Sequence, residues 1–238
     1  MRVRTLASLV ALSLALSAGP ALAKENISKV FGGITAEEGR EYGSLDSVNG
    51  GITIRDHAVV RSAETVNGGI SVGERARVDS AETVNGGITL AREAQAGELS
   101  TVNGGIKLGE AVQVTADVDT VNGSIKLLAG ARVGGDVDTV NGAISLARAS
   151  VGGNIQNVNG DLTLDDGSVV EGNVRYSKPS GWNWSASRDP RVVIGRDSEV
   201  RGELVFEREV ELYVHESAKI GKVTGATVQR YSGNRPPR

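Results

Sequence analysis

The chain has 238 residues and a formal net charge of −3 at pH 7, from 26 Lys and Arg against 29 Asp and Glu. This acidic balance argues against nucleic acid as a partner, because phosphate binding needs clustered basic side chains. The sequence contains no cysteine, which excludes a disulfide framework and a lipid-anchored lipoprotein. Its 32 Gly and 3% aromatic content indicate many short strands and tight turns around a narrow aliphatic core.

Residues 1–23 are predicted to be a signal peptide. Arg2 and Arg4 form a basic start, residues 6–16 an apolar run, and Ala21-Leu22-Ala23 a small-residue cleavage site. The run is too short to span a bilayer, so we expect no membrane span in the mature chain; the alternative is an N-terminal membrane anchor. Without the two arginines, 24 basic residues face 29 acidic ones, a net charge of −5.

A Val-Asn-Gly unit recurs along most of the chain at a nearly constant spacing. Its asparagines are Asn49, Asn67, Asn85, Asn103, Asn122, Asn141 and Asn159, at steps of 18, 18, 18, 19, 19 and 18 residues. A period this short predicts a repeat architecture in which no unit is stable alone. Each residue of a coil loses roughly 1–2 kcal/mol of backbone entropy, whereas about four buried aliphatics return only about 1.5–3 kcal/mol each.

Aliphatic residues follow one another at six-residue steps within each repeat, as in Val48, Ile54, Val60, Val66 and Val72. Three such steps make one coil. We therefore predict an all-β fold, a single-stranded parallel β-helix (β-solenoid) of triangular cross-section with about 18 residues per coil. The same count places the valines of Val-Asn-Gly in the core, stacked one on another.

The predicted boundaries follow from where this rhythm begins, breaks and resumes. Val30-Phe31-Gly32-Gly33-Ile34 is a degenerate first copy with Phe31 in the Asn place, and we expect Phe31 and Tyr42 to cap that end. The solenoid is expected over 24–176, an inserted loop over 177–190, further coils over 191–229 and a disordered tail over 230–238. The two 19-residue coils need an extra corner residue or bulge around 117–120 and 136–139.

The Asn row is the strongest pattern in the sequence. Asn-Gly suits a backbone with positive φ, and identical Asn side chains stacked in register can bond to one another as a ladder. We predict a structural Asn ladder; the alternative is a row that binds glycans or ions.

A row of mostly acidic residues precedes each Val by two positions. Its members are Asp46, Glu64, Glu82, Ser100, Asp119, Asp138 and Gln156. Stacked carboxylates repel unless they are solvated or bridged by a cation. A solvated corner is favoured over a metal stripe, because calcium needs six to eight oxygens and no Asp-rich calcium-binding repeat is visible.

Patterns typical of catalysis are weak. His57 and His215 are unrelated in repeat phase, and Asp165-Asp166 is favoured as a turn over a catalytic pair. Trp182 and Trp184, in the inserted loop, are the candidate binding residues, because aromatic rings stack on sugars and anchor protein interfaces. The alternative is that both rings cover the solenoid flank. No catalytic, cofactor-binding or metal-binding residue is assigned, and no cofactor is expected.

Two family resemblances arise from these motifs. The repeated T-V-N-G-G-I units resemble the toast-rack type of adhesin solenoid domain found in exported bacterial proteins. The stretches 167–174 and 193–204, the latter Val-Ile-Gly-Arg-Asp-Ser-Glu-Val-Arg-Gly-Glu-Leu, are similar to bactofilin coils, and 127–137 fits the same form. Bactofilins are right-handed triangular β-helices that polymerise end to end, so this resemblance favours a right-handed solenoid. The chain departs from them in its signal peptide, Asn row and Trp loop.

The favoured function is an exported, non-catalytic structural or adhesin-like module, periplasmic or extracellular, with an envelope glycan or protein as partner. The first alternative is a bactofilin-like scaffold that self-associates through its solenoid ends. The second is a parallel β-helix enzyme that acts on polysaccharides.

Overall fold

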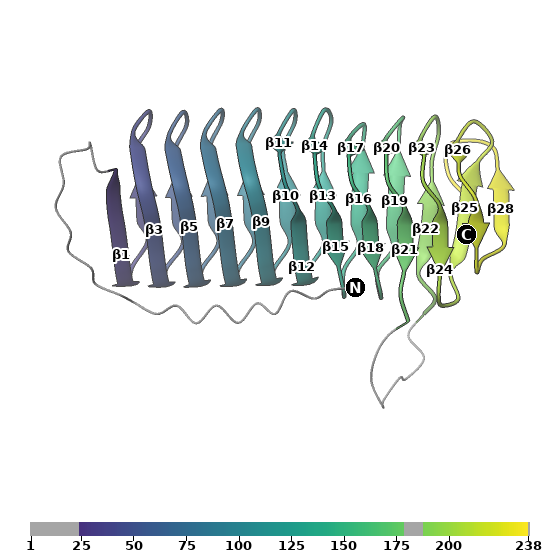
Figure 1. Ribbon diagram of the computed structural model, residues 1–238, viewed down its shortest axis with the longest axis horizontal. Coiled ribbons are helices and arrows are strands. Elements are labelled where there is room, and N and C mark those ends of the chain that lie inside the picture. The colour runs from purple at the N-terminus through teal and green to yellow at the C-terminus, as the bar shows by residue number, and fades with distance from the viewer. Residues whose placement is uncertain (1–23, 179–187, 238) are drawn as a thin grey trace.

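The computed structural model describes residues 24–178 and 188–237, and within them all regular secondary structure is β. Strands lie side by side in a straight stack, from β1 at one end to β28 at the other (Figure 1). Every pairing joins strands in parallel, each to the next coil along the stack. The predicted β-solenoid is therefore confirmed. In the described part of the chain, no helix is long and apolar enough to cross a membrane.

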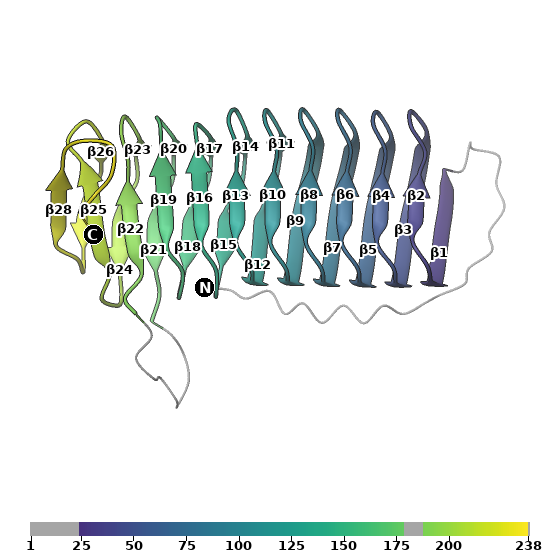
Figure 2. The ribbon, with the colours of Figure 1, turned by 180° about the vertical axis from the view of Figure 1, so that it is seen from behind.

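The first sheet has eleven short strands, one from each coil, so the described chain forms eleven coils. These strands run along one face of the stack (Figure 2). They are β2 (Ile34–Ala36), β4 (Ile52–Ile54), β6 (Ile70–Val72), β8 (Ile88–Leu90), β10 (Ile106–Leu108), β13 (Ile125–Leu127), β16 (Ile144–Ala147), β19 (Leu162–Asp165), β22 (Arg191–Ile194), β25 (Glu211–His215) and β28 (Val228–Tyr231). β28 extends to Tyr231, past the boundary at 229 expected from the sequence.

The second sheet wraps round the remaining sides. It begins with the long strands β1 (Glu25–Phe31), β3 (Glu41–Asn49), β5 (Val59–Asn67), β7 (Arg77–Asn85) and β9 (Gln95–Asn103). Later coils divide this strand in two, as β11 (Gln113–Val114), β12 (Val118–Asn122), β14 (Arg132–Val133), β15 (Val137–Thr139), β17 (Ser150–Val151), β18 (Ile155–Asn157), β20 (Val169–Val170), β21 (Val174–Tyr176), β23 (Glu199–Val200), β24 (Leu204–Phe206), β26 (Lys219–Ile220) and β27 (Val223–Thr224).

The division of the long strand explains the two 19-residue coils. Ala96 pairs with Val114, but Leu99 pairs with Val118, so the extra residue lies between Val114 and Val118. The next coil repeats this longer corner between Val133 and Val137. The extra residue thus lies within 115–117 and 134–136, at the start of the segments predicted from the sequence, and the long strand is interrupted there.

In the core, equivalent residues of successive coils stack in columns. The prediction that the valines of Val-Asn-Gly form one of these buried columns is wrong. In the coil that contains β5, the inward positions are Ile52, Ile54, Ala58, Val60, Ala63 and Thr65, all at most 4% exposed. Val66 is partly exposed and Val84 is 41% exposed, so the valines of Val-Asn-Gly point outward. The bend after Val60 adds a residue between inward positions, which shifts the alternation of the strand and breaks the six-residue count.

Thr takes the inward place that was predicted for Val, and its hydroxyl is satisfied there. Thr65 Oγ1 donates to Gly50 O at 2.8 Å, and Thr83 Oγ1 donates to Gly68 O at 2.8 Å. Thr101 repeats the bond to Gly86 O at 2.9 Å. A buried hydroxyl with a partner avoids a desolvation cost of about 1–3 kcal/mol, so a polar residue can line this part of the core.

The Asn-Gly corner does not need positive φ, which corrects the sequence-based expectation. Neither the asparagines nor the glycines that follow them have positive φ. Glycine is needed there because coils approach closely: a Cβ on Gly86 would overlap Gly68 O of the preceding coil. Positive φ occurs instead at the opposite corner in most coils, as at His57 (60°), Arg75 (53°) and Glu93 (59°).

The N-terminal end differs from the predicted cap. Phe31 occupies the Asn column, opposite Asn49, but it is 78% exposed and covers nothing. β1 is the first described strand of the stack. An aromatic ring that points outward from it in the Asn column therefore has no further described coil to pack on. Tyr42 is 2% exposed and fills the core of the first coils, where its hydroxyl accepts a hydrogen bond from Glu37 N at 3.1 Å.

We predict that Gly86→Ala destabilises the fold by about 2 kcal/mol or more, because its Cβ would meet a backbone carbonyl that cannot move alone. Gly87→Ala is the matched control. Its Cβ would lie 2.9 Å from Gly105 O, but the equivalent places in later coils hold Ser124 and Ala143. Urea unfolding of both variants measures the difference; equal losses would show that close approach is not what requires the first glycine.

Candidate functional site: an axial groove on the rod flank

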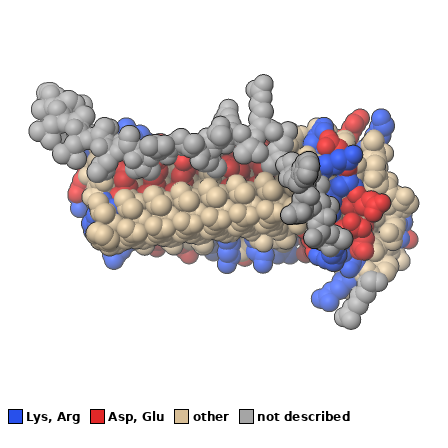
Figure 3. All heavy atoms as spheres, turned by 90° about the horizontal axis from the view of Figure 1, so that it is seen from below, with Lys and Arg blue, Asp and Glu red and all other residues tan. Residues whose placement is uncertain are grey.

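The outward-facing valines line a groove that runs along the rod axis. It has a volume of about 340 Å³ and is lined by Val30, Val48, Val66, Val84 and Val102, with Asp46, Glu64 and Glu82 beside them and Ser28, Lys29, Ser47, Thr65, Thr83 and Ser100 completing the wall. We call this the axial groove, and its two rows the valine row and the carboxylate row. Figure 3 shows an uncharged band along the underside of the rod next to a line of acidic side chains.

Strand geometry places the two rows side by side. Glu64 and Val66 are two residues apart on β5 and therefore project from the same face, about 7 Å apart. The register repeats this pair in each neighbouring coil, because Asp46 pairs with Glu64 and Glu64 with Glu82. Each row therefore continues along the axis at the interstrand spacing of about 4.8 Å.

The carboxylate row is half-buried, so its acids are less solvated than a fully exposed corner would leave them. Burial raises the pKa of Glu64, and the neighbouring charges of Glu82 and Asp46 raise it further. Burial and nearby carboxylates likewise raise the pKa of Glu82. Unlike Glu93, which lies 2.6 Å from Arg75, none of Asp46, Glu64 and Glu82 forms an ion pair with a described Lys or Arg.

The row continues beyond the groove with stronger shifts. Burial raises the pKa of Asp119 to about 6, against a hydrogen bond from Ser100 that lowers it. Burial and the charges of Asp136 and Asp119 raise the pKa of Asp138 to about 7. Asp138 Oδ1 is buried without a hydrogen-bond partner in the described structure. Within the described ranges, no group of three or more His, Asp or Glu could hold a metal ion.

The predicted Asn ladder is confirmed as an unbroken chain of side-chain hydrogen bonds. Each Asn donates Nδ2–H to Oδ1 of the preceding Asn, at 3.0 Å for Asn67, Asn85, Asn103 and Asn122, 2.9 Å for Asn141 and 2.8 Å for Asn159. At the N-terminal end, Asn49 donates to Val30 O at 3.4 Å. All amide dipoles therefore point the same way, an arrangement in which the bonds polarise one another.

Arg208 terminates the ladder. Asn157 pairs with Tyr176 and Tyr176 with Phe206, so Arg208 lies in the Asn column two coils beyond Asn159. Its guanidinium reaches back to donate to Asn159 Oδ1 at 2.8 Å and to Val158 O at 2.9 Å, with only 8% of the side chain exposed. A cation thus meets the last free carbonyl, the negative end of the aligned dipoles.

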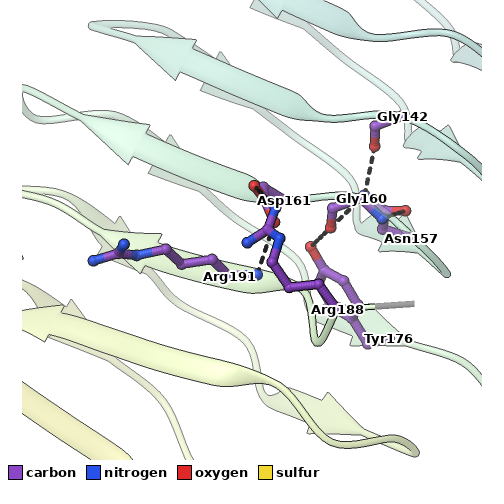
Figure 4. Close-up of polar contacts among 7 residues, drawn as sticks. All are labelled: Gly142, Asn157, Gly160, Asp161, Tyr176, Arg188 and Arg191. Atoms are coloured by element: carbon purple, nitrogen blue, oxygen red, sulfur yellow. Dashed lines mark hydrogen bonds and ion pairs between the residues drawn. The ribbon is translucent and has the colours of Figure 1, made fainter. Parts of the chain in front are cut away.

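The coil that contains Asn157 is held by a second polar cluster (Figure 4). Asn157 takes the inward Thr place and donates to Gly142 O at 3.0 Å, while Tyr176 donates to Gly160 O at 2.8 Å. Burial raises the pKa of Tyr176 well above its usual range, so this phenol remains a donor. Asp161 accepts from Arg191 N at 2.8 Å and from Arg188 at 2.7 Å, which ties the start of β22 to the preceding coil.

The other residues singled out from the sequence lie in separate places. Asp165 ends β19 and Asp166 follows at φ 53°, so the turn interpretation is confirmed; burial and Asp166 raise the pKa of Asp165. His57 forms a positive-φ corner, and His215 is buried beside Ser217, with Nδ1 2.9 Å from Ser217 Oγ. Trp182 and Trp184 lie outside the described residues.

The sequence-based reasoning missed the axial groove because it counted the valines as core. Alternation within a strand could have revealed it: Ala63, Glu64, Thr65 and Val66 read inward, outward, inward and outward, once Ala63 is taken as buried. Comparisons with protein-family models, curated proteins and solved structures find no match. The site is therefore interpreted from its own geometry.

We predict that Arg208→Met lowers the free energy of unfolding by about 2–3 kcal/mol, because it leaves Asn159 Oδ1 and Val158 O without their charged donor. Arg201→Met is the control, since Arg201 pairs with Glu171 on the exposed surface, where an ion pair contributes little to stability. Chemical denaturation compares the two. Equal and small losses would contradict a ladder stabilised by its terminal cation.

We also predict that the protein is more stable at pH 5 than at pH 8. The raised pKa values of Asp119 and Asp138 mean that the folded state binds these protons more tightly than the unfolded state. Their contribution is complete below the unfolded pKa of about 4 and is lost as pH rises through about 6 and 7. We expect each of the two groups to lower the free energy of unfolding by on the order of 1 kcal/mol between pH 5 and pH 8, after solvent screening.

Asp138→Asn tests the source of this pH dependence. The variant should flatten the change in melting temperature between the two pH values, whereas Glu38→Gln, on an exposed corner, should leave it intact. An unchanged slope in Asp138→Asn would assign the effect to other groups.

Proposed function

We propose that this chain is an exported, non-catalytic β-solenoid that serves as a rigid structural or adhesin-like module of the bacterial envelope or surface. The observation that carries the proposal is the uninterrupted Asn ladder over seven coils, closed by Val30 O at one end and Arg208 at the other. Both backbone and side-chain hydrogen bonds join the coils of this rod. Such a rod suits a rigid spacer that holds a binding surface away from the point at which the protein is attached.

The carboxylate row also supports a binding role over a catalytic one. General acid–base chemistry needs two carboxyl groups whose environments push their pKa values apart. Glu64 and Glu82 have the same setting and are shifted in the same direction by the same causes. Within the axial groove, Glu64 and Glu82 therefore present equivalent charges in successive coils, which suits the recognition of an extended partner.

A polymer-forming scaffold is the second candidate function. The observation that favours it is β1, a seven-residue strand that pairs only with β3 among the described strands and carries Val30 and Phe31 at 51% and 78% exposure. Unpaired, apolar edge strands are templates for pairing with another chain.

One experiment separates these functions from the polysaccharide-acting alternative. The purified protein is incubated with isolated bacterial envelopes and with a panel of polysaccharides. We expect co-sedimentation with envelopes and no release of sugar products. Product release that is lost in Asp165→Asn or Asp166→Asn would replace the proposal with an enzyme. Filaments that disappear in Phe31→Lys would replace it with a scaffold.

The double variant Trp182→Ala and Trp184→Ala is measured in the same assay. Weaker co-sedimentation at unchanged melting temperature would place envelope recognition in the inserted loop. A lower melting temperature at unchanged co-sedimentation would assign both rings to covering the solenoid.

A further inference from the structure

The axial groove combines two features that the rod itself does not use. Its valine row leaves aliphatic surface in water, with Val84 41% and Val30 51% exposed. Asp46, Glu64 and Glu82 of its carboxylate row form no ion pair within the described chain, although acids elsewhere on the surface, such as Glu93 and Glu171, are paired with arginine. Aliphatic contact and unneutralised negative charge, side by side, complement a partner that is both apolar and basic.

The spacing of the rows restricts the shape of that partner. Equivalent carboxylates recur at about 4.8 Å, so three of them span about 9.6 Å. Side chains at positions i, i+3 and i+7 of an α-helix lie at about 0, 4.5 and 10.5 Å along its axis, within reach of flexible lysines. An extended strand along the groove would present like side chains only every 6.8 Å or so and would lose register after one coil.

We propose that the axial groove docks a basic amphipathic α-helix of a partner polypeptide, with its apolar side on the valine row and its lysines or arginines on the carboxylate row. The groove spans five coils, from Val30 to Val102, or about 19 Å, which is the length of roughly 13 helical residues. The inference rests on the proposed function only in treating the rod flank as a binding surface.

The test uses the purified protein and three synthetic Leu/Lys peptides of about 18 residues. One has the helical period, the second has the same composition in strict alternation, and the third is the helical peptide with glutamate in place of lysine. Isothermal titration calorimetry measures binding, and circular dichroism reports helix formation. We expect the helical basic peptide to bind, to gain helix content and to weaken as salt rises, and the acidic peptide not to bind.

Matched variants locate the binding. Glu64→Gln with Glu82→Gln should weaken it by about tenfold or more, whereas Glu203→Gln with Glu216→Gln, the same charge change outside the groove, should alter it by less than about twofold. Val66→Ser with Val84→Ser should weaken it by about fivefold or more if the valine row is in contact. The melting temperature of the Glu64→Gln, Glu82→Gln variant should be unchanged or raised, because the two substitutions remove repulsion between neighbouring carboxylates.

Three results would overturn the proposal. Tighter binding of the alternating peptide would assign the groove to an extended partner. Equal loss in the two glutamine pairs would show that only net charge matters. No binding of any peptide, with envelope co-sedimentation intact, would reject the helix and leave the proposed function standing.

Discussion

The close approach of successive backbones at the Asn-Gly corner is the constraint on which the rest of the structure depends. Coils stack in register only if no side chain separates them there, and the space beside Gly86 is filled by Gly68 O. Once the coils are this close, Thr can reach the corner carbonyl of the preceding coil from inside and Asn can reach its counterpart from outside. Every element of the Thr-Val-Asn-Gly motif therefore has a separate physical task, with Val left for the flank.

The last amide of the Asn ladder needs a hydrogen-bond donor that is not another Asn. Within the solenoid each Asn side chain bonds to the next, but Asn159 Oδ1 has no further Asn beyond it, because Lys178 stands in the Asn place of the following coil. Arg208 donates to this oxygen from two coils away. The core widens at the same place: the inward column changes from Thr139 through Asn157 and Tyr176 to Phe206, with the last two rings 5.7 Å apart.

The axial groove follows from the same strand bend that upset the six-residue count. An odd step between Val60 and Ala63 turns the next Val outward and brings Thr inward. That single shift removes a column of aliphatics from the core and lays it beside a row of acids on the flank. Desolvation of those acids raises their pKa values, so the protein pays a stability cost that a basic partner would relieve.

Periodicity alone was sufficient to predict the solenoid, the coil length and the Asn ladder, because in-register stacking makes equal spacing in sequence into contact in space. The turn at Asp165-Asp166 was predicted from its local sequence, in which Gly167 and Ser168 follow the two acids. Periodicity could not decide which face each strand presents, since a one-residue bend reverses every later side chain and leaves the period intact. The outward valines, the exposed Phe31, the desolvated carboxylates and the reach of Arg208 depend on that bend and on contacts between distant coils, and these emerge only when the chain is folded.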